Sequence, residues 1–190
     1  MRRIIFSLSL AVAVSVTSGC SSIILATTDG PIENDDLDRS LGNFIDDQQI
    51  ETVTIVNIKH LSDELKSANI SVVSYNGVVL IVGQVSTQQE RDQITQVARE
   101  VKGVRQVHNQ LSIAPRTSTL VRSNDAWLTS KVRTQFLLES EDFSNIKVVT
   151  ENSVVYLIGN VTQNTGDKAV NIARTVGGVQ RIVKVFEYPD

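Results

Sequence analysis

The chain contains a tandem repeat, and this repeat limits its possible folds more than any other feature. Residues 70–85 match residues 146–161 at a constant offset, and residues 98–104 match residues 173–179 at an offset one position shorter. A repeat unit of about 75 residues is longer than the roughly 20–50 residues of solenoid units and suits a small globular domain. The sequence therefore predicts two similar domains in tandem.

Each copy predicts the same order of elements. The pair Asn76-Gly77 separates two β-branched runs and predicts a hairpin, because both residues tolerate the positive φ of tight hairpin turns. Residues 78–85 are apolar throughout, which is typical of a strand covered on both faces. A helix over 88–102 and a last strand over 104–113 follow. The second copy has the weaker turn 151–153, a helix from about 166 to 176 and a strand over 179–188.

The first element of each copy is predicted to be a helix. In the second copy Leu128, Val132 and Phe136 recur every four residues, and Asn124 and Asp125 are candidate N-caps. In the first copy Ile50, Val53, Ile58 and Leu61 have helical spacing, although the Thr and Val content of that segment favours a strand. We follow the repeat and predict a helix there too.

The predicted fold class is α+β, with two tandem domains over 46–115 and 117–190. Each domain is helix, strand, strand, helix, strand, with two helices packed on a three-stranded mixed sheet. The sheet is mixed because a strand-helix-strand crossover leaves its two strands parallel.

The N-terminus predicts export and lipidation. Arg2 and Arg3 precede an uncharged apolar run over 4–16, which is too short for a spanning helix of roughly 20 residues. The only cysteine, Cys20, follows Ser-Gly, which resembles the lipobox of bacterial lipoproteins. Thr17 departs from that motif, and an ordinary secretory signal with a free thiol is the alternative. Residues 1–19 are thus a predicted signal peptide.

The segment 20–45 is predicted to be an acidic, flexible tether behind the lipidated cysteine, because charged linkers extend. Its apolar end, Leu41, Phe44 and Ile45, is alternatively an arm on the first domain. Without Arg2 and Arg3 the chain has 16 basic and 21 acidic residues, a net charge of −5. We expect no nucleic-acid partner for such a chain, since recognition of nucleic acid requires a basic surface.

Catalytic and metal-binding motifs are not evident. His60 and His108 lie in different predicted elements without a nearby carboxylate at ligand spacing. Neighbouring acidic pairs would point apart on a helix or be solvated in a loop; they are Asp35-Asp36, Asp46-Asp47 and Asp63-Glu64. We expect a non-enzymatic protein without a cofactor or a metal. Gly83 and Gly159 are expected at close backbone approaches.

The two repeats and the lipobox together resemble the BON family, and more closely its dual-BON outer-membrane lipoproteins. The residues that carry the resemblance are Val78, Leu80 and Gly83, their matches Val154, Tyr156 and Gly159, and the pairs Gly103-Val104 and Gly178-Val179. The resemblance implies a non-enzymatic module that binds phospholipid, supports envelope integrity and acts near the machinery that assembles outer-membrane proteins.

Trp127, the only tryptophan, is the candidate membrane contact. It lies on the flank of its predicted helix with Lys131, Thr134 and Leu138, away from the core face. An indole beside a lysine suits a bilayer interface, where the ammonium meets anionic phosphate. Ser130 and Thr134 would add hydrogen-bond donors, and Arg133 would add charge. The alternative is that Trp127 packs between the two domains.

Two functions therefore remain open. In the first, the second domain binds anionic phospholipid while a palmitate-bearing Cys20 holds the chain on the outer membrane, facing the periplasm. Ser21 favours that membrane, because it is not the Asp that resembles an inner-membrane retention signal. In the second, the chain is a scaffold that docks on the outer-membrane assembly machinery through sheet edges or its first helix. Headgroup and oligomeric state do not follow from the sequence.

The lipobox predicts that Cys20→Ala abolishes lipidation, because the thiol is the acceptor of the diacylglycerol. Cells labelled with radioactive palmitate should incorporate label into the wild-type chain and none into the variant. An unlabelled wild-type chain would show that Thr17 destroys the motif.

Overall fold

The computed structural model describes residues 41–189. The chain divides into two units, 1–33 and 34–190, and only the second is described below. The predicted signal peptide, Cys20 and most of the expected tether lie outside the described residues. The end assigned to that tether was wrong, because helix α2 already begins at Leu41.

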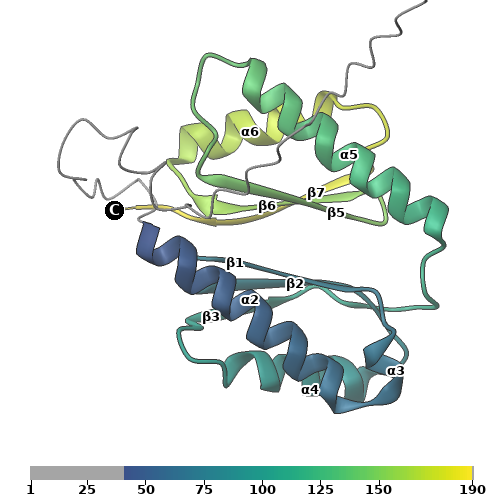
Figure 1. Cartoon of the computed structure of the whole chain (residues 1–190). Helices are drawn as coiled ribbons and strands as arrows, with labels where there is room; N and C mark the ends of the chain where they lie inside the picture. Colours follow the sequence, from purple (N-terminus) through teal and green to yellow (C-terminus); the bar gives the residue numbers. More distant parts are fainter. Residues whose placement is uncertain (1–40, 190) are drawn as a thin grey trace, which may run out of the picture. The chain divides into compact units, whose positions relative to one another are not determined.

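The chain is an α+β protein with two domains of the predicted order (Figure 1). The first domain contains α2 (Leu41–Leu61), α3 (Asp63–Lys66), β1 (Ile70–Tyr75), β2 (Val78–Val85), α4 (Gln88–Arg99), β3 (Gln106–Asn109) and β4 (Ser112–Ile113). The second contains α5 (Thr119–Leu138), β5 (Ile146–Glu151), β6 (Val154–Asn160), α6 (Gln163–Thr175) and β7 (Arg181–Glu187). In each sheet the central strand, β2 or β6, pairs antiparallel with the strand before it and parallel with the strand after the crossover helix.

Several predicted boundaries were wrong, and local hydrogen bonds explain why. The strand expected over 104–113 is interrupted, because the Asn109 side chain accepts from Leu111 N at 3.0 Å and donates to Arg91 O at 2.9 Å. Helix α6 begins three residues early because Thr162 caps it by accepting from the N–H of Thr165.

Helix α5 also begins earlier than predicted. Its N-cap is Ser118, whose hydroxyl accepts from Val121 N, so Asn124 and Asp125 lie inside the helix and do not cap it. The side chain of Asp125 instead turns inward and is buried.

Each domain uses a buried aspartate on its first helix to hold its hairpin turn. Asp125 accepts from the backbone N–H groups of Asn152 and Ser153, both at 2.8 Å. In the first domain Asp47 accepts from Asn76 N at 2.8 Å and Gly77 N at 3.0 Å. The four turn residues have positive φ, between 49° and 77°, which confirms the predicted hairpins.

The two glycines matched by the repeat lie at close backbone approaches, as predicted. A Cβ added to Gly83 would overlap the carbonyl of Asn69, and one added to Gly159 would overlap the carbonyl of Asn145. Any side chain at either position would therefore displace the neighbouring backbone.

The core face of α2 differs from the predicted one. Ile50 and Ile58 are buried as expected, but Val53 is exposed, and so is Leu61 near the end of the helix. Thr54 takes the buried position between the two isoleucines. The apolar residues of α2 therefore cover two faces, and one of them is left in solvent.

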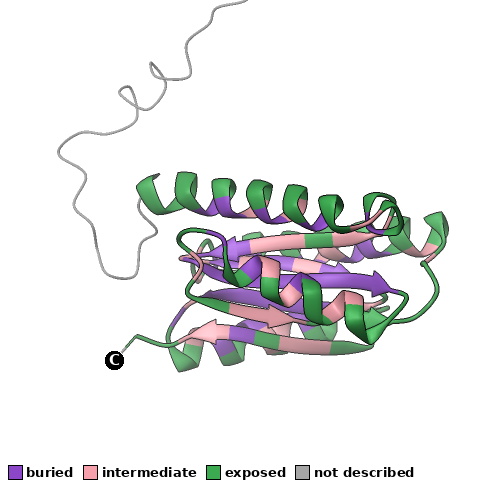
Figure 2. Cartoon of the chain, turned by 90° about the horizontal axis from the view of Figure 1, so that it is seen from below, coloured by how far each residue is buried: buried purple, intermediate pink, exposed green. Residues whose placement is uncertain are grey.

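The two sheets pack face to face and share one hydrophobic core. Val79 and Ile81 of β2 pack under the helices of the first domain, whereas Leu80 and its alternate neighbours contact Tyr156 and Ile158 of β6. All eight residues of β2 are buried, which confirms the predicted two-sided cover. Figure 2 shows that the buried residues gather on the strands between the helices. The helices of the two domains consequently occupy the two outer faces of the pair of sheets.

An ion pair at the domain boundary also protects a sheet edge. Glu51 of α2 lies 2.7 Å from Lys147 of β5. The same two side chains bind the backbone of Ser74 in the edge strand β1: its N–H donates to Glu51 at 2.9 Å, and its carbonyl accepts from Lys147 at 2.8 Å. The bridge thus joins the domains and occupies edge groups that could otherwise pair with another strand.

Within residues 41–189 no helix has the length and apolarity required to cross a membrane.

The shared core predicts that one substitution destabilises both domains. Leu80→Ala should lower the free energy of unfolding by about 2–5 kcal/mol, because it leaves a cavity between the sheets. Denaturant unfolding followed separately in each half should show one common transition, shifted as a whole. Two separate transitions, with only the first domain affected, would contradict a shared core.

Candidate functional site

Helix α5 carries an exposed apolar stripe that includes Trp127. Leu120, Trp127, Lys131, Thr134 and Leu138 are separated by seven, four, three and four residues, so they share one side of the helix. The exposed fractions are large for apolar side chains: Leu120 80%, Trp127 54% and Leu138 73%. We call these five residues the α5 stripe.

The α5 stripe has a cation beside its aromatic ring. The Lys131 ammonium lies 4.2 Å from the centroid of the Trp127 ring, within cation–π distance. Trp127 is absent from the core that the two sheets share. The geometry therefore does not support the alternative in which Trp127 packs between the domains.

The remaining predicted site residues are placed differently. The hydroxyls of Ser130 and Thr134 donate to the backbone of their own helix, to Ala126 O at 3.0 Å and Ser130 O at 2.9 Å. Arg133 donates to Val148 O at 3.1 Å and so reaches toward the edge strand β5. The structure brings Trp127, Lys131, Thr134 and Leu138 together and sets Arg133 apart from them.

Two apolar residues of this surface were missed by sequence reasoning. Leu120 lies in the first turn of α5, before the helix start that was expected near Asn124. Leu137, with 85% of its surface exposed, flanks the stripe near the other end. The seven-residue spacing from Leu120 to Trp127 was the available signal.

The solvent-facing charge of α5 is positive. Its basic residues are Arg122, Lys131 and Arg133, and its only acidic residue is Asp125, which is buried against the hairpin turn. This surface therefore presents cations and apolar side chains together.

A hollow of about 590 Å³ adjoins the C-terminal end of α5. Phe136, Leu137, Phe143 and Ile146 give it apolar walls. Its charged lining residues are of both signs: Arg133, Lys147, Glu139, Glu141 and Asp142. The ring centroids of Phe136 and Phe143 are 4.8 Å apart, so the two rings stack and hold this end of the helix against the following loop.

The family model of the BON domain matches residues 46–115 and 124–190. The chain belongs to the BON family. Three relatives align with most of this BON chain. Outer membrane lipoprotein DolP of Haemophilus influenzae is 36% identical over 80% of this chain and 79% of its own length. The 21 kDa hemolysin of Actinobacillus pleuropneumoniae is 32% identical over 79% of this chain and 78% of its own. Osmotically-inducible protein Y of Escherichia coli is 32% identical over 76% and 73%.

Among solved structures, CdsD, a structural protein of the type III secretion system of Chlamydia trachomatis, aligns at 14% identity with a TM-score of 0.30. The alignment covers 75% of this chain and 63% of CdsD, less than two thirds of it. At that TM-score the likeness informs neither the fold nor the function.

The first helices of the two BON domains correspond position by position. Asp47 and Asp125 both hold a hairpin turn, and a Cβ at Gly103 or Gly178 would meet Ile50 or Leu128, respectively. Both pairs of helix residues differ by 78 positions. At that offset Trp127 corresponds to Gln49 of α2, so the two BON domains present different chemistry at the same place.

Glu151 is a half-buried carboxylate that links the two BON domains. It accepts from Gln84 Nε2 and, at 3.4 Å, from Asn69 Nδ2, both in the first domain. Gln84 also accepts from the hydroxyl of Thr117 in the connecting segment at 3.1 Å. Burial raises the pKa of Glu151 above its usual value of 4.5, and nearby Asp125 acts in the same direction.

The histidines are not brought together as a metal site. Burial lowers the pKa of His108, whereas His60 is exposed on α2. Among the residues described, no three His, Cys, Asp or Glu side chains are grouped as ligands.

The raised pKa of Glu151 predicts a pH-dependent difference between the wild type and Glu151→Gln. An acid with a raised folded-state pKa contributes stability that is complete below its unfolded pKa and is lost as the pH rises through the folded one. The variant should therefore gain stability relative to the wild type as the pH rises from about 4.5 toward 7. Free energies of unfolding measured across this range test it. A difference that does not change with pH would show that the carboxylate is not perturbed in the folded state.

Proposed function

We propose that this chain is an envelope lipoprotein of the outer membrane whose second BON domain binds anionic phospholipid through α5. The α5 stripe supports the proposal most directly: three large apolar side chains surround a cation on a helix that has no exposed acidic residue. The printed name of the relative from Haemophilus influenzae, an outer membrane lipoprotein, supports the location.

The energetics favour an interface over water for this surface. Burial of a leucine side chain contributes about 1.5–3 kcal/mol, and Leu120, Leu137 and Leu138 are all mostly exposed in the free protein. Each basic residue held near an anionic surface contributes about 1 kcal/mol more. Trp127 adds an amphipathic ring, which suits the boundary between the apolar part of a bilayer and its headgroups.

The predicted lipid on Cys20 would make a weak contact by α5 sufficient. The 20 or so residues between Cys20 and Leu41 can span at most about 70 Å when fully extended. A tether of that reach keeps α5 close to the bilayer at high effective concentration. The anchor supplies residence on the membrane, and α5 supplies selection for anionic lipid.

A second candidate function is docking on the outer-membrane assembly machinery without lipid recognition. The observation that favours it is the exposed apolar face of α2, which includes Ile45, Val53 and Val56. In that case the α5 stripe would contact protein, and the chain would show no affinity for protein-free vesicles.

Trp127→Glu should abolish binding to vesicles that contain anionic lipid and leave the fold intact. The substitution removes the interfacial ring and adds a charge that anionic lipid repels. At an exposed position it should cost about 0.5 kcal/mol of stability or less. Sedimentation of the unlipidated chain with phosphatidylglycerol vesicles measures binding, and added salt should weaken it in the wild type.

The matched control is Gln49→Glu, which adds the same charge at the corresponding position of α2. It should bind vesicles as the wild type does. If Trp127→Glu folds and still sediments with the vesicles, the lipid site lies elsewhere. If the wild type binds no vesicle, lipid binding is excluded and docking on the assembly machinery is the function that remains.

A further inference from the structure

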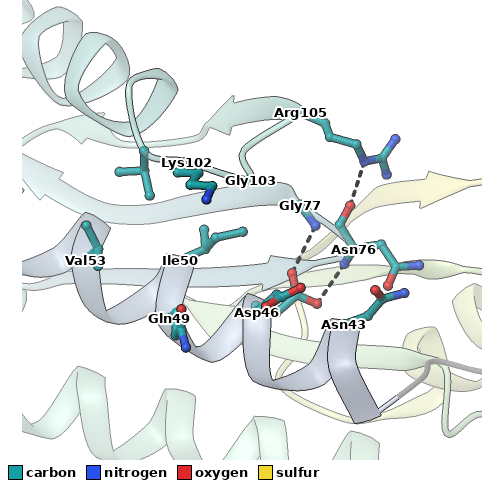
Figure 3. Close-up of a pocket in the computed structure, with 12 residues that line it drawn as sticks. Asn43, Asp46, Gln49, Ile50, Val53, Asn76, Gly77, Lys102, Gly103 and Arg105 are labelled. Atoms are coloured by element: carbon teal, nitrogen blue, oxygen red, sulfur yellow. Dashed lines mark hydrogen bonds between the residues drawn. The ribbon is translucent and has the colours of Figure 1, made fainter.

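The first BON domain has a pocket where the second has its tryptophan. The pocket has a volume of about 730 Å³ and lies between the first half of α2, the β1–β2 turn and the loop that follows α4 (Figure 3). Gln49 and Val53 line it. At the offset of 78 positions they correspond to Trp127 and Lys131, whose ring and ammonium lie against each other on α5.

The loop after α4 makes the other wall of this pocket. Lys102 stands there, and its counterpart in the repeat is Gly177, beside which nothing lies within 4 Å of an added Cβ. The first domain thus has a smaller side chain than tryptophan on the helix and a larger one than glycine on the loop. With these two differences, the first domain has a walled hollow where the second has an exposed stripe.

The pocket combines one unsatisfied buried acceptor with two exposed charged side chains. Asn76 Oδ1 is buried and accepts no hydrogen bond, although a buried polar atom normally has a partner. Asp46 and Lys102 form no hydrogen bond or ion pair with any described residue, and they carry opposite charges. Lys102 lies at the Ile50 and Val53 end of the pocket, whereas Asn76 lies at the end nearer Asn43 (Figure 3).

The floor between these polar groups is apolar. Ile50, Val53 and Val101 form it, and Gly103 lets the loop approach Ile50 closely, since an added Cβ would lie 3.1 Å from the Ile50 side chain. A ligand therefore needs an N–H donor for Asn76, an acceptor for Lys102 and an apolar group between them. The volume of the pocket falls within the range of ordinary ligand pockets, roughly 300–1,000 Å³.

We infer that this pocket binds an extended peptide segment of another protein. A backbone N–H would donate to Asn76 Oδ1, a backbone carbonyl would accept from the Lys102 ammonium, and an apolar side chain would pack on Ile50 and Val53. A basic side chain or an N-terminal amine on the peptide would meet Asp46. A peptide supplies all of these groups in one short, repeating unit.

The position of the pocket favours a peptide over a lipid. The helices of the two domains lie on opposite outer faces of the paired sheets, because each sheet uses its other face for the shared core. When α5 rests on a bilayer, the helix layer of the first domain faces away from it. This choice of ligand rests on the proposed membrane contact of α5, whereas the pocket itself does not.

The test selects a random-sequence peptide library, displayed on phage, against the full lipidated chain in phosphatidylglycerol-containing nanodiscs. Selected peptides should share an apolar residue and shift the NMR amide signals of Gly77 and Gly103. Asn76→Gly removes the unpartnered acceptor at a φ of 49° that glycine tolerates. Lys102→Gln removes the ammonium, and Gln49→Trp places an indole in the hollow. Each should weaken peptide binding about tenfold or more.

The controls are Asn152→Gly, the same change in the corresponding turn, and Lys59→Gln, an exposed lysine of α2 outside the pocket. Both variants should bind the peptides as the parent does. Trp127→Glu should also bind them, and this variant separates failure of the membrane contact from failure of this site. Melting temperatures identify any variant that loses its fold, and Lys102→Gln, at an exposed position, then decides.

Three results would overturn the inference. In the first, no peptide is enriched over empty nanodiscs. In the second, the selected peptides bind Gln49→Trp and Lys102→Gln as tightly as they bind the parent. In the third, a short-chain phosphatidylethanolamine displaces the peptides and shifts the same amides, which would make the pocket a lipid-headgroup site.

Discussion

The packing of one sheet on the other determines which surfaces this protein has left to use. Each central strand is buried on both faces, so the helices must cover the outer face of each sheet and cannot enter the shared core. The polar contacts at the boundary follow from the same packing. Glu51 and Lys147 meet at an otherwise open edge of β1, and Glu151 is half-buried because it accepts hydrogen bonds from the first domain. The outer faces of the helices, among them α2 and α5, remain exposed.

Much of this architecture could be predicted because it depends on local chemistry. The Asn-Gly turn, the apolar run of β2 and the repeat itself specify the hairpins and the order of elements without knowledge of the packing. The role of Asp47 and Asp125 could not be predicted in this way. A helical aspartate ordinarily lies in water, and only the folded hairpin shows two backbone N–H groups within reach of each carboxylate. Thr54 was missed for the same reason, since a threonine between isoleucines does not look like a core residue.

The candidate site shows where such prediction stops. The position of Trp127 on a flank followed from the periodicity of Leu128, Val132 and Phe136, because one face of a helix determines the others. The hydroxyls of Ser130 and Thr134 were expected to face a ligand, but a serine or threonine within a helix can donate to the carbonyl four residues earlier, and both do. Leu120 was missed because the true N-cap lies six residues before Asn124.

The duplication explains how one scaffold can present two different surfaces. The positions that both domains must keep are those that hold the turn and the core, such as the buried aspartate and the isoleucine or leucine beside the loop glycine. Gln49 and Trp127 are under neither constraint, since both project outward from their helices. A change there alters what the surface binds at little cost in stability. Because the shared core sets the two first helices in opposite outer layers, a contact made by one leaves the other accessible. Either first helix can therefore be covered by a contact while the other stays exposed to solvent.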